Sequence, residues 1–340
     1  MIDNKHQQFE NAAKKVGLVF LGGSNLDVSD QMNHFKIWLK ENKNAEMGFM
    51  ENHIEVRTNP QILLPGAQSA LCFGFNYNHD CQQDSRAKSA KYACYKDYHK
   101  MIKKKLNAFV EQNFSDESKN HFRICIDTLP VLERAITANS SGFIGKNTCY
   151  IHPEHGSFML LGLILCKTNF SQSSYDKPNP NQRTKLGGCG TCKRCQIHCP
   201  TGALDQEYKL DARKCISYWT IEHRGEIPLD FWPHLKHNYF GCDICQNVCP
   251  YNRQKETSNL EVHRDSKLSL EEIALMNQTQ YEQWFGGTPM TRAKISGLKR
   301  NALIALAQHD PKKSREIAAV LSKSVDEVVK NTAIKVLEII

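Results

Sequence analysis

The sequence predicts an α+β fold in three parts, over residues 1–170, 171–260 and 261–340. Three observations lead to this prediction. Helical and strand-like patterns alternate up to residue 170, cysteines gather between residues 185 and 255, and only helical patterns follow. A chain of 340 residues is also too long for one ordinary core, so more than one domain is expected.

The N-terminal part combines amphipathic helices with apolar strands. We expect helices near residues 5–16, 29–41, 86–113 and 130–139, where apolar residues recur at helical spacing. Strands are expected at residues 69–77, 122–127 and 158–166, which are rich in apolar and aromatic side chains. The polar segment 167–188 has the composition of a linker. No apolar run approaches the roughly 20 residues that a membrane helix needs, so we expect no membrane partner.

The middle part contains two cysteine runs, CGTCKRCQIHCP and CDICQNVCP, with one further cysteine between them. The first run has the spacing of bacterial ferredoxins, in which the fourth cysteine binds the other of two clusters. Crossed ligation of this kind divides the eight thiols into two sets of four. The sets are Cys189, Cys192, Cys195 and Cys249, and Cys199, Cys215, Cys242 and Cys245.

Eight thiols are what two [4Fe–4S] clusters require, so we predict a ferredoxin-like domain. Zinc or disulfides are the alternative, but a zinc site usually takes two pairs separated by a longer loop. The other six cysteines are scattered and lie mostly among apolar residues. We expect them to be reduced thiols of a cytoplasmic protein, since the N-terminus also lacks the apolar core of a signal peptide.

The C-terminal part has helical patterns at residues 269–276, 300–308, 314–323 and 326–340. Short amphipathic helices joined by brief turns are typical of a stacked module of the HEAT type. The net charge is +8, and residues 289–323 hold eight basic side chains against two acidic ones. A polyanion partner and a solvated helix surface explain this charge equally well.

Two clusters alone would make an electron-transfer protein. Such a protein would have no function for the N-terminal part. That part contains neither a GxGxxG fingerprint nor a Walker loop, and the D-x-H-x-x-G signature of some cobalamin proteins is absent. The segments DTLPVLER, GKNT and CISYWTIEHRG occur in order around the cysteine runs. Together with RTNPQILLPGAQSALCFGFNY at 57–77, they resemble the epoxyqueuosine reductase family, whose members are cobalamin-dependent and complete queuosine synthesis in tRNA.

This resemblance implies a cobalamin-binding domain at 1–170, the ferredoxin-like domain at 171–260 and a tRNA-binding helical module at 261–340. The substrate would be epoxyqueuosine at the wobble position of tRNA, reduced to queuosine with two electrons and two protons. An external single-electron donor of the flavodoxin or ferredoxin type would feed the clusters, and these would reduce a cobalamin that rests as cob(II)alamin. The family also implies a monomer.

Asp127 matches the proton donor that has been proposed for this family. An ordinary aspartic acid has a pKa of about 3.9, so the role requires a raised pKa. Burial beside a corrin ring with no cationic neighbour would raise it, and apolar Ile124 and Ile126 are compatible with such a site. The alternative is that Asp127 merely caps a helix that begins near Pro130.

Cofactor contacts are expected from residues in the matching motifs, although each of them could instead have a purely structural role. They are Arg57, Asp127, Lys146, Asn147, His152, Ser157 and Ser217. His152 is not expected to bind cobalt, because the resemblance implies a base-off cobalamin without a protein ligand.

Phosphate contacts to tRNA are expected from basic residues at the end of the CISYWTIEHRG motif and in the C-terminal part. They are His223, Arg224, Arg292, Lys294, Lys299 and Arg300. Lys299 and Arg300 come first, because the pattern places them at the start of a helix, where the dipole favours phosphate.

Two other functions fit part of the sequence. A corrinoid reductive dehalogenase pairs the same cofactors, but a small substrate would not need a basic helical face. A plain two-cluster electron carrier would leave the N-terminal residues without a function.

Overall fold

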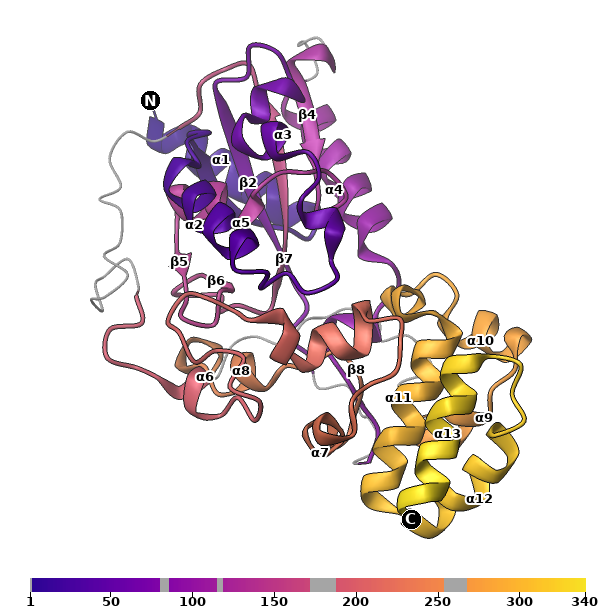
Figure 1. Cartoon of the computed structure of the whole chain (residues 1–340). Coiled ribbons are helices and arrows are strands. Elements are labelled where there is room, and N and C mark those ends of the chain that lie inside the picture. The colour runs from indigo at the N-terminus through magenta and orange to yellow at the C-terminus, as the bar shows by residue number, and fades with distance from the viewer. Residues whose placement is uncertain (1, 80–85, 115–118, 172–187, 254–267) are drawn as a thin grey trace.

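The computed structural model describes residues 2–79, 86–114, 119–171, 188–253 and 268–340 (Figure 1). Its N-terminal part is built on a four-stranded sheet with the order β1–β2–β7–β4, in which all neighbouring strands are antiparallel. The strands are Val19–Ser24, Ser69–Asn76, Met159–Cys166 and Phe122–Cys125. Strands β2 and β7 pair along their full length, from Ser69 opposite Cys166 to Asn76 opposite Met159.

Both faces of this sheet are buried, because successive side chains of a strand point to opposite sides. Leu71 and Phe73 of β2 belong to a core that includes α1 (Ile2–Lys15) and α4 (Tyr98–Asn113). Their neighbour Cys72 belongs to a second core, which includes α5 (Glu133–Ser140). The central strands therefore read as almost continuous apolar runs, as the sequence patterns at 69–77 and 158–166 indicate.

The predicted helices at 5–16, 29–41 and 130–139 correspond to α1, α2 (Ser29–Lys40) and α5. The prediction of one helix over 86–113 is wrong in its first half. The side chain of Asp97 accepts the backbone N–H of His99 and caps α4, so the helix begins at Tyr98. The preceding residues form the short strand β3 (Lys88–Ser89) and a 3-10 turn. The sequence patterns also missed strand β1 and the short helix α3 (Ile54–Thr58).

The cysteine-rich segment contains two single-turn helices that pack against each other, α6 (Arg194–Ile197) and α8 (Ile244–Asn247). Between them lie a π-helical turn at Tyr218–Glu222, helix α7 (Trp232–Leu235) and strand β8 (Asn238–Phe240). The hairpin of β5 (Phe143–Ile144) and β6 (Tyr150–Ile151) reaches towards this segment from the N-terminal part (Figure 1). Of the predicted linker at 167–188, residues 172–187 lie outside the described residues.

The C-terminal part is helical, as the sequence predicts. Helix α11 (Lys294–His309) lies at its centre and contacts its neighbours on several sides (Figure 1). These neighbours include α9 (Leu270–Leu275), α12 (Pro311–Leu321) and α13 (Glu327–Ile339), while α10 (Gln278–Phe285) follows α9. The sequence patterns missed α10. No helix among the described residues has both the length and the apolarity needed to cross a membrane.

The division at residues 170 and 260 stays a prediction, but one hydrophobic core extends across it. This core contains Ala87 and Ala93 from the N-terminal part, Trp232 and Phe240 from the middle part, and the inner face of α11. Strand β3 also pairs in parallel with β8, with Lys88 opposite Asn238. The middle and C-terminal parts are therefore stabilised as one packed unit that includes a segment of the N-terminal part.

Candidate functional site

The first predicted set of cysteines is brought together around one small cavity. Cys189, Cys192, Cys195 and Cys249 line it, although Cys249 is more than fifty residues from the others in sequence. Burial, followed by the negative charge of Cys189, raises the pKa of the Cys195 thiol to about 11. Four thiolates in so small a space need compensating cations, which the irons of a cluster supply.

The members of the second predicted set lie near one another. Cys215 interacts electrostatically with Cys199, and Cys242 interacts with both of them. Cys245 in turn interacts with Cys242 and Cys215. The hydroxyl of Ser217 and backbone N–H groups of the following turn bond to Cys215. Ser217 therefore belongs to this thiol set rather than to a separate cofactor site.

The scattered cysteines are mostly core thiols, as the sequence indicates. Cys72, Cys94, Cys125 and Cys166 are buried, and Cys81 lies outside the described residues. Cys149 differs from them, because its thiol makes a hydrogen bond with Cys245 of the second set. No sequence pattern indicates this contact, since Cys149 directly follows the GKNT motif and lies far from both cysteine runs.

Asp127 lies in the loop that follows β4, and two residues at the start of α4 hold its carboxylate. The hydroxyl of Tyr98 donates to Oδ2, and Nε2 of His99 lies 2.6 Å from Oδ1. The other ring nitrogen of His99 lies 2.5 Å from Oδ1 of Asp97. The hydrogen bond with Asp127 raises the pKa of His99 to about 9, so the imidazole is a cation near neutral pH.

These contacts correct the expected surroundings of Asp127. The sequence predicted an apolar site without a cationic neighbour, whereas the carboxylate forms an ion pair with His99 and its side chain is 49% exposed. Asp127 makes no cap bond to α5, whose N-cap residue is Leu132 and has no side-chain cap. Sequence reasoning missed His99 and Tyr98. The available sign was the Asp97-Tyr98-His99 triplet at a helix start, which places two hydrogen-bonding side chains next to a capping aspartate.

Tyr92 connects Asp127 with the second thiol set and with the C-terminal part. Burial, followed by the charges of Asp243, Glu222 and Asp127, raises its pKa well above the ordinary range of a tyrosine. Asp243 follows Cys242 directly in the chain. The guanidinium of Arg292 interacts with the same tyrosine and with Asp127. Asp127 therefore lies where the sheet, the cysteines and the helical part meet.

Arg57 is held near this place by local contacts. Its Nε donates to the backbone oxygen of Asn52 at 3.3 Å, and its guanidinium lies 5.6 Å from the ring centre of Phe35. Arg57 and Asp127 both interact electrostatically with Glu133. Burial raises the pKa of Glu133 to about 8, and its Oε1 atom has no hydrogen-bond partner among the described residues. Glu133 was not predicted as a site residue.

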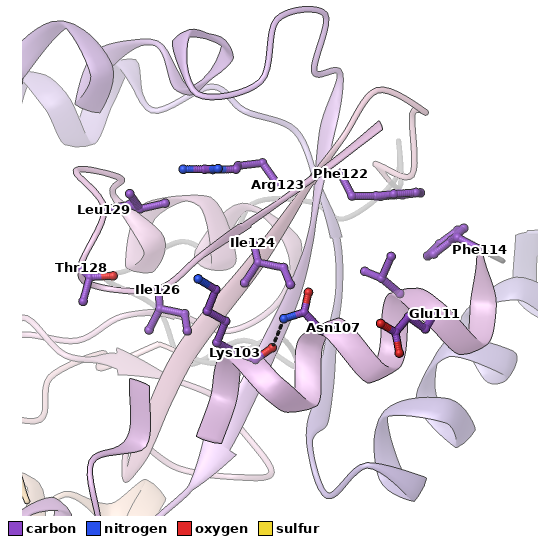
Figure 2. A pocket seen from close by; sticks show the side chains of 11 residues that line it. Lys103, Asn107, Glu111, Phe114, Phe122, Arg123, Ile124, Ile126, Thr128 and Leu129 are labelled. Carbon is purple, nitrogen blue, oxygen red and sulfur yellow. Dashed lines mark hydrogen bonds between the residues drawn. The ribbon is translucent and has the colours of Figure 1, made fainter. Parts of the chain in front are cut away.

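A cleft of about 600 Å³ begins at the residues on either side of Asp127 and runs between α4 and the edge strand β4 (Figure 2). Ile126, Thr128 and Leu129 line its near end, and Phe114 and Phe122 lie at its far end. Lys103, Asn107 and Arg123 add polar groups to this mostly apolar surface, as Figure 2 shows. An apolar floor with a few polar groups is typical of a site for a large organic ligand.

The GKNT loop contains two side chains that the sequence predicts to bind a cofactor, and both lie beside the first thiol set. Nζ of Lys146 lies 2.9 Å from Oε1 of Glu207 and donates to the backbone oxygen of Gly190. Lys146 and Asn147 both line the cavity of the first thiol set. The contact of Lys146 with a cobalamin phosphate or amide stays a prediction, and in this structure its ammonium is buried and paired with Glu207.

Two further predicted cofactor contacts are also occupied by protein groups. Ser157 is buried, and its hydroxyl donates to Gln246 while its backbone N–H donates to Asn252. Nδ1 of His152 accepts the backbone N–H groups of Glu154 and His155. The cofactor roles of Ser157 and His152 stay predictions, and the hydrogen bonds described here show that both side chains also fix the loop.

The predicted RNA contacts fall into two groups. Arg224, Arg292 and Lys294 are exposed. Arg224 donates to the backbone oxygen of Arg292, whose own guanidinium pairs with Glu222 at 2.8 Å. Arg224 and Arg292 therefore place positive charge on the surface near Asp127 and the π-helical turn, and Lys294 adds an exposed charge at the start of α11.

The other three predicted RNA contacts make hydrogen bonds within the protein. The full burial of Arg300 contradicts its predicted role, whereas the roles of Lys299 and His223 stay predictions. Arg300 is 0% exposed and donates to the backbone oxygens of Trp219, His223 and Gly225. Nζ of Lys299 donates to the backbone oxygen of Met276. His223 is buried, with its ring nitrogens at Glu46 and the backbone of Glu226. Helix α11 begins at Lys294, so Lys299 and Arg300 lie beyond its first turn.

Comparisons with known proteins agree with the two thiol sets. Residues 188–252 match a family model described as a 4Fe-4S double cluster binding domain. Residues 57–128 match a model described as epoxyqueuosine reductase QueG, DUF1730. The second match ends one residue after Asp127 and includes His99 and Tyr98.

Whole-chain similarity is of the same kind. The epoxyqueuosine reductase of Cellulophaga algicola is 35% identical over 87% of this chain and 97% of that protein. The structure of epoxyqueuosine reductase from Streptococcus thermophilus has a TM-score of 0.85 at 26% identity, over 98% of this chain and 90% of that one. A crystal structure of epoxyqueuosine reductase with an epoxyqueuosine-modified tRNA-Tyr stem loop has a TM-score of 0.79 at 25% identity, over 98% and 89%. The chain belongs to the epoxyqueuosine reductase family, an enzyme family of queuosine biosynthesis.

Proposed function

We propose that this protein reduces epoxyqueuosine at the wobble position of tRNA to queuosine, with electrons that pass through two [4Fe–4S] clusters. The observation that carries the proposal is the position of Asp127. It bonds to Tyr98 and His99 at the start of α4, and Tyr98 packs against Tyr92. The residue before Tyr92 bonds to Asp243, beside the second thiol set. The reaction adds two electrons and two protons to an epoxide and releases an alkene and water. An external donor of the flavodoxin or ferredoxin type would supply the electrons singly.

The clusters would be held by the two thiol sets. The first binds to Cys189, Cys192, Cys195 and Cys249, and the second to Cys199, Cys215, Cys242 and Cys245. Tyr98, which bonds to Asp127, packs against Tyr92. The backbone N–H of the neighbouring Lys91 donates to Asp243, which follows Cys242. We therefore take the second cluster as the one nearer to the substrate. It would therefore deliver electrons to the reacting site, while the first cluster receives them from the donor.

The residues around Asp127 fit a cobalamin in two respects. The unpartnered Oε1 atom of Glu133 offers a hydrogen bond to a corrin amide, and Arg57 lies beside it. The cleft along α4 offers an apolar surface with amide and basic groups, although it is smaller than a whole cobalamin. Bound there as cob(II)alamin at rest, the cofactor would supply, once reduced, a strongly nucleophilic cobalt that opens epoxides. We assign Arg57, Glu133 and the residues that line the cleft as its protein contacts.

Asp127 would protonate the epoxide oxygen as its C–O bond opens, because an alkoxide is a poor product without an acid. The proton comes from the pair of Asp127 and His99, whose atoms Oδ1 and Nε2 are 2.6 Å apart. The raised pKa of His99 keeps one proton on this pair at neutral pH. The hydroxyl of Tyr98 holds the second carboxylate oxygen, so Asp127 stays oriented while the proton moves.

His99 would also return a proton to Asp127 after the transfer. After Asp127 gives up its proton, His99 passes its Nε2 proton to the carboxylate and takes another from solvent, since its side chain is 33% exposed. The second proton lets the new hydroxyl leave as water. Asp97, at the other ring nitrogen, fixes the ring and favours its protonated form.

The tRNA would lie across the seam between the sheet and the helical part. Arg224, Arg292 and Lys294 would contact its phosphates, and the modified nucleotide would be turned out of the anticodon loop towards Asp127. The helical part from α9 to α13 would then be a HEAT-like RNA-binding module. We expect the active protein to be a monomer in the cytoplasm.

An anaerobic assay tests the proposal directly. Reconstituted protein is incubated with a stem loop that contains epoxyqueuosine and a chemical reductant, with and without cobalamin. Queuosine should form only with cobalamin, and the visible spectrum should report a bound corrin. A protein that binds no corrin, or converts the stem loop equally well without it, would contradict the proposal. Turnover of a halogenated compound in place of the RNA would support the dehalogenase alternative.

A further inference from the structure

The first thiol set is closed on one side by a segment of the N-terminal part. The backbone N–H of Lys146 donates to Sγ of Cys189 at 3.4 Å. The side chain of the same lysine crosses the rim of the site, where it bonds to Gly190 and pairs with Glu207. Lys146 and Asn147 are therefore part of the wall of a site whose thiols all come from the cysteine runs.

Asn147 lies in this wall with only part of its amide group hydrogen-bonded. It is 4% exposed and lines the cavity together with the four cysteines. Its Oδ1 atom accepts the backbone N–H of Cys149 at 3.2 Å. This bond identifies the oxygen of the amide, because a backbone N–H needs an acceptor. The Nδ2 group is thereby fixed on the other side, and it has no hydrogen-bond partner among the described residues.

The backbone is shaped to bring Asn147 close to the cavity. A Cβ atom at Gly145 would lie 2.7 Å from Oδ1 of Asn147 and 2.5 Å from the side chain of Ile151. Thr148 has a φ of +65°, in the left-handed region that non-glycine residues rarely adopt. A buried amide N–H₂ without an acceptor destabilises a folded protein, so a donor kept in this position needs an acceptor.

We propose that Asn147 donates a hydrogen bond from Nδ2 to a sulfur atom of the first [4Fe–4S] cluster, and so raises its reduction potential. Reduction adds an electron to the cluster, and a hydrogen bond to sulfur stabilises the more negative state. The N–H of Lys146 acts in the same direction on Cys189. Asn147 is a positioning and tuning residue of the cluster, in place of the cobalamin contact expected from the sequence. The inference depends on the cluster alone and not on the acid at Asp127.

Redox titration followed by electron paramagnetic resonance tests the inference. Asn147→Leu removes the donor at similar size, and Asn147→Asp keeps the acceptor for Cys149 while it replaces the N–H₂ group by a carboxylate oxygen. Both variants should retain about eight irons, and one of the two clusters should titrate at a more negative potential. The shift should be larger for Asn147→Asp, because a negative charge opposes reduction. The other cluster should be unchanged.

The exposed Asn247 of α8 offers a matched control, since Asn247→Leu makes the same substitution between two cysteines without a buried amide. It should leave both potentials unchanged. Unchanged potentials in both Asn147 variants would overturn the inference. So would loss of the cluster from both variants, because Asn147 would then serve the assembly of the site and not its potential. These readouts do not require tRNA turnover, so they are independent of the proposed reaction.

Discussion

The imidazole of His99 lies between two carboxylates, with Nε2 2.6 Å from Oδ1 of Asp127 and Nδ1 2.5 Å from Oδ1 of Asp97. Asp97 also caps the helix that carries His99, so the same aspartate fixes the backbone and the ring. The pKa of His99 is raised to about 9, so its ring carries a proton at neutral pH within hydrogen-bond distance of Asp127. We therefore infer that His99 is the source of the proton that Asp127 transfers.

Asp127→Asn should abolish turnover and leave both clusters in place. Asparagine keeps the size of the side chain and its bond from Tyr98, but it cannot exchange a proton. We expect a loss of at least about 100-fold, which is the smaller end of the usual contribution of general acid catalysis. Single-turnover assays on the modified stem loop, with iron and corrin content measured alongside, would check this. A variant with near-normal activity would remove the acid role from Asp127.

His99→Gln should lower the rate and remove its dependence on pH in the alkaline range. The pKa of His99 is raised to about 9 by its bond with Asp127, so the wild-type rate should be steady near neutrality and decline above about pH 9. Glutamine keeps a hydrogen bond to Asp127 but carries no exchangeable charge. Pre-steady-state rates from pH 6 to 10 would measure both effects. A His99→Gln protein with the wild-type rate and profile, beside an inactive Asp127→Asn protein, would leave the acid in place and exclude the relay.

The same ion pair should make stability depend on pH. The ordinary pKa of histidine is 6.5, and that of His99 in the folded protein is about 9. The contribution of protonated His99 to the free energy of unfolding is therefore complete below about pH 6.5. It is lost as the pH rises through 9. The melting temperature of wild type should exceed that of His99→Gln at pH 6, and the difference should shrink by pH 10. A difference that grows with pH would contradict this assignment of charge.

Cys215→Ser should remove one cluster only. Cys215 lies outside both cysteine runs, yet it completes the second set. The iron content should fall from about eight to about four per chain. Cys166→Ser is the matched control, because Cys166 is a buried core thiol and its substitution should leave the iron content unchanged. Retention of eight irons in Cys215→Ser would show that another ligand completes the set.

Arg300→Met should destabilise the protein without acting on RNA directly. The substitution leaves the carbonyl groups of Trp219, His223 and Gly225 without their donor, at about 1–3 kcal/mol for each unsatisfied group. Arg300→Lys should restore little, because an ammonium cannot reproduce the planar fork of a guanidinium. Thermal unfolding of the three proteins would test this. An unchanged melting temperature in Arg300→Met would contradict a structural role.

Lys294→Ala and Arg224→Ala should both weaken RNA binding, since both residues are exposed. Lys294→Ala should leave stability unchanged, whereas Arg224→Ala also removes hydrogen bonds to the backbone of Ile221 and Arg292. Each lost phosphate contact should reduce the salt dependence of affinity by about one unit of the logarithmic slope. Titrations of a stem loop at several salt concentrations would measure this slope. The exposed Lys312→Ala, on α12, serves as a control for general loss of charge.

The two cysteine sets could be proposed from the sequence, because the geometry of a cluster restricts the spacing of the cysteines that bind it. Asp127 could be named only by resemblance, and its partner could not. His99 lies 28 residues before it, on a helix that begins later than the hydrophobic pattern indicates. Contacts between a loop and a helix of this kind depend on the packing of the sheet between them, and no local pattern encodes that packing.

The burial of individual basic residues could not be predicted from the sequence either, even within one helix. Lys294 and Arg300 lie on the same helix, six positions apart, but one is exposed and the other is fully buried. From their charge, both side chains are expected on the surface, because an arginine is rarely buried without a carboxylate partner. The backbone oxygens of the π-helical turn and its continuation take the place of that carboxylate. Their position depends on a turn that hydrophobic periodicity does not detect.

The parallel pairing of Lys88–Ser89 with Asn238–Phe240 has a consequence for how the chain folds during synthesis. About 150 residues separate the partners, so a nascent chain cannot complete this contact until the ribosome has made most of the protein. Until then Ala87 and Ala93 lack the apolar neighbours that cover them in the finished molecule. A chain released after the first cysteine run would therefore retain an open seam, and chaperones would recognise it as incomplete.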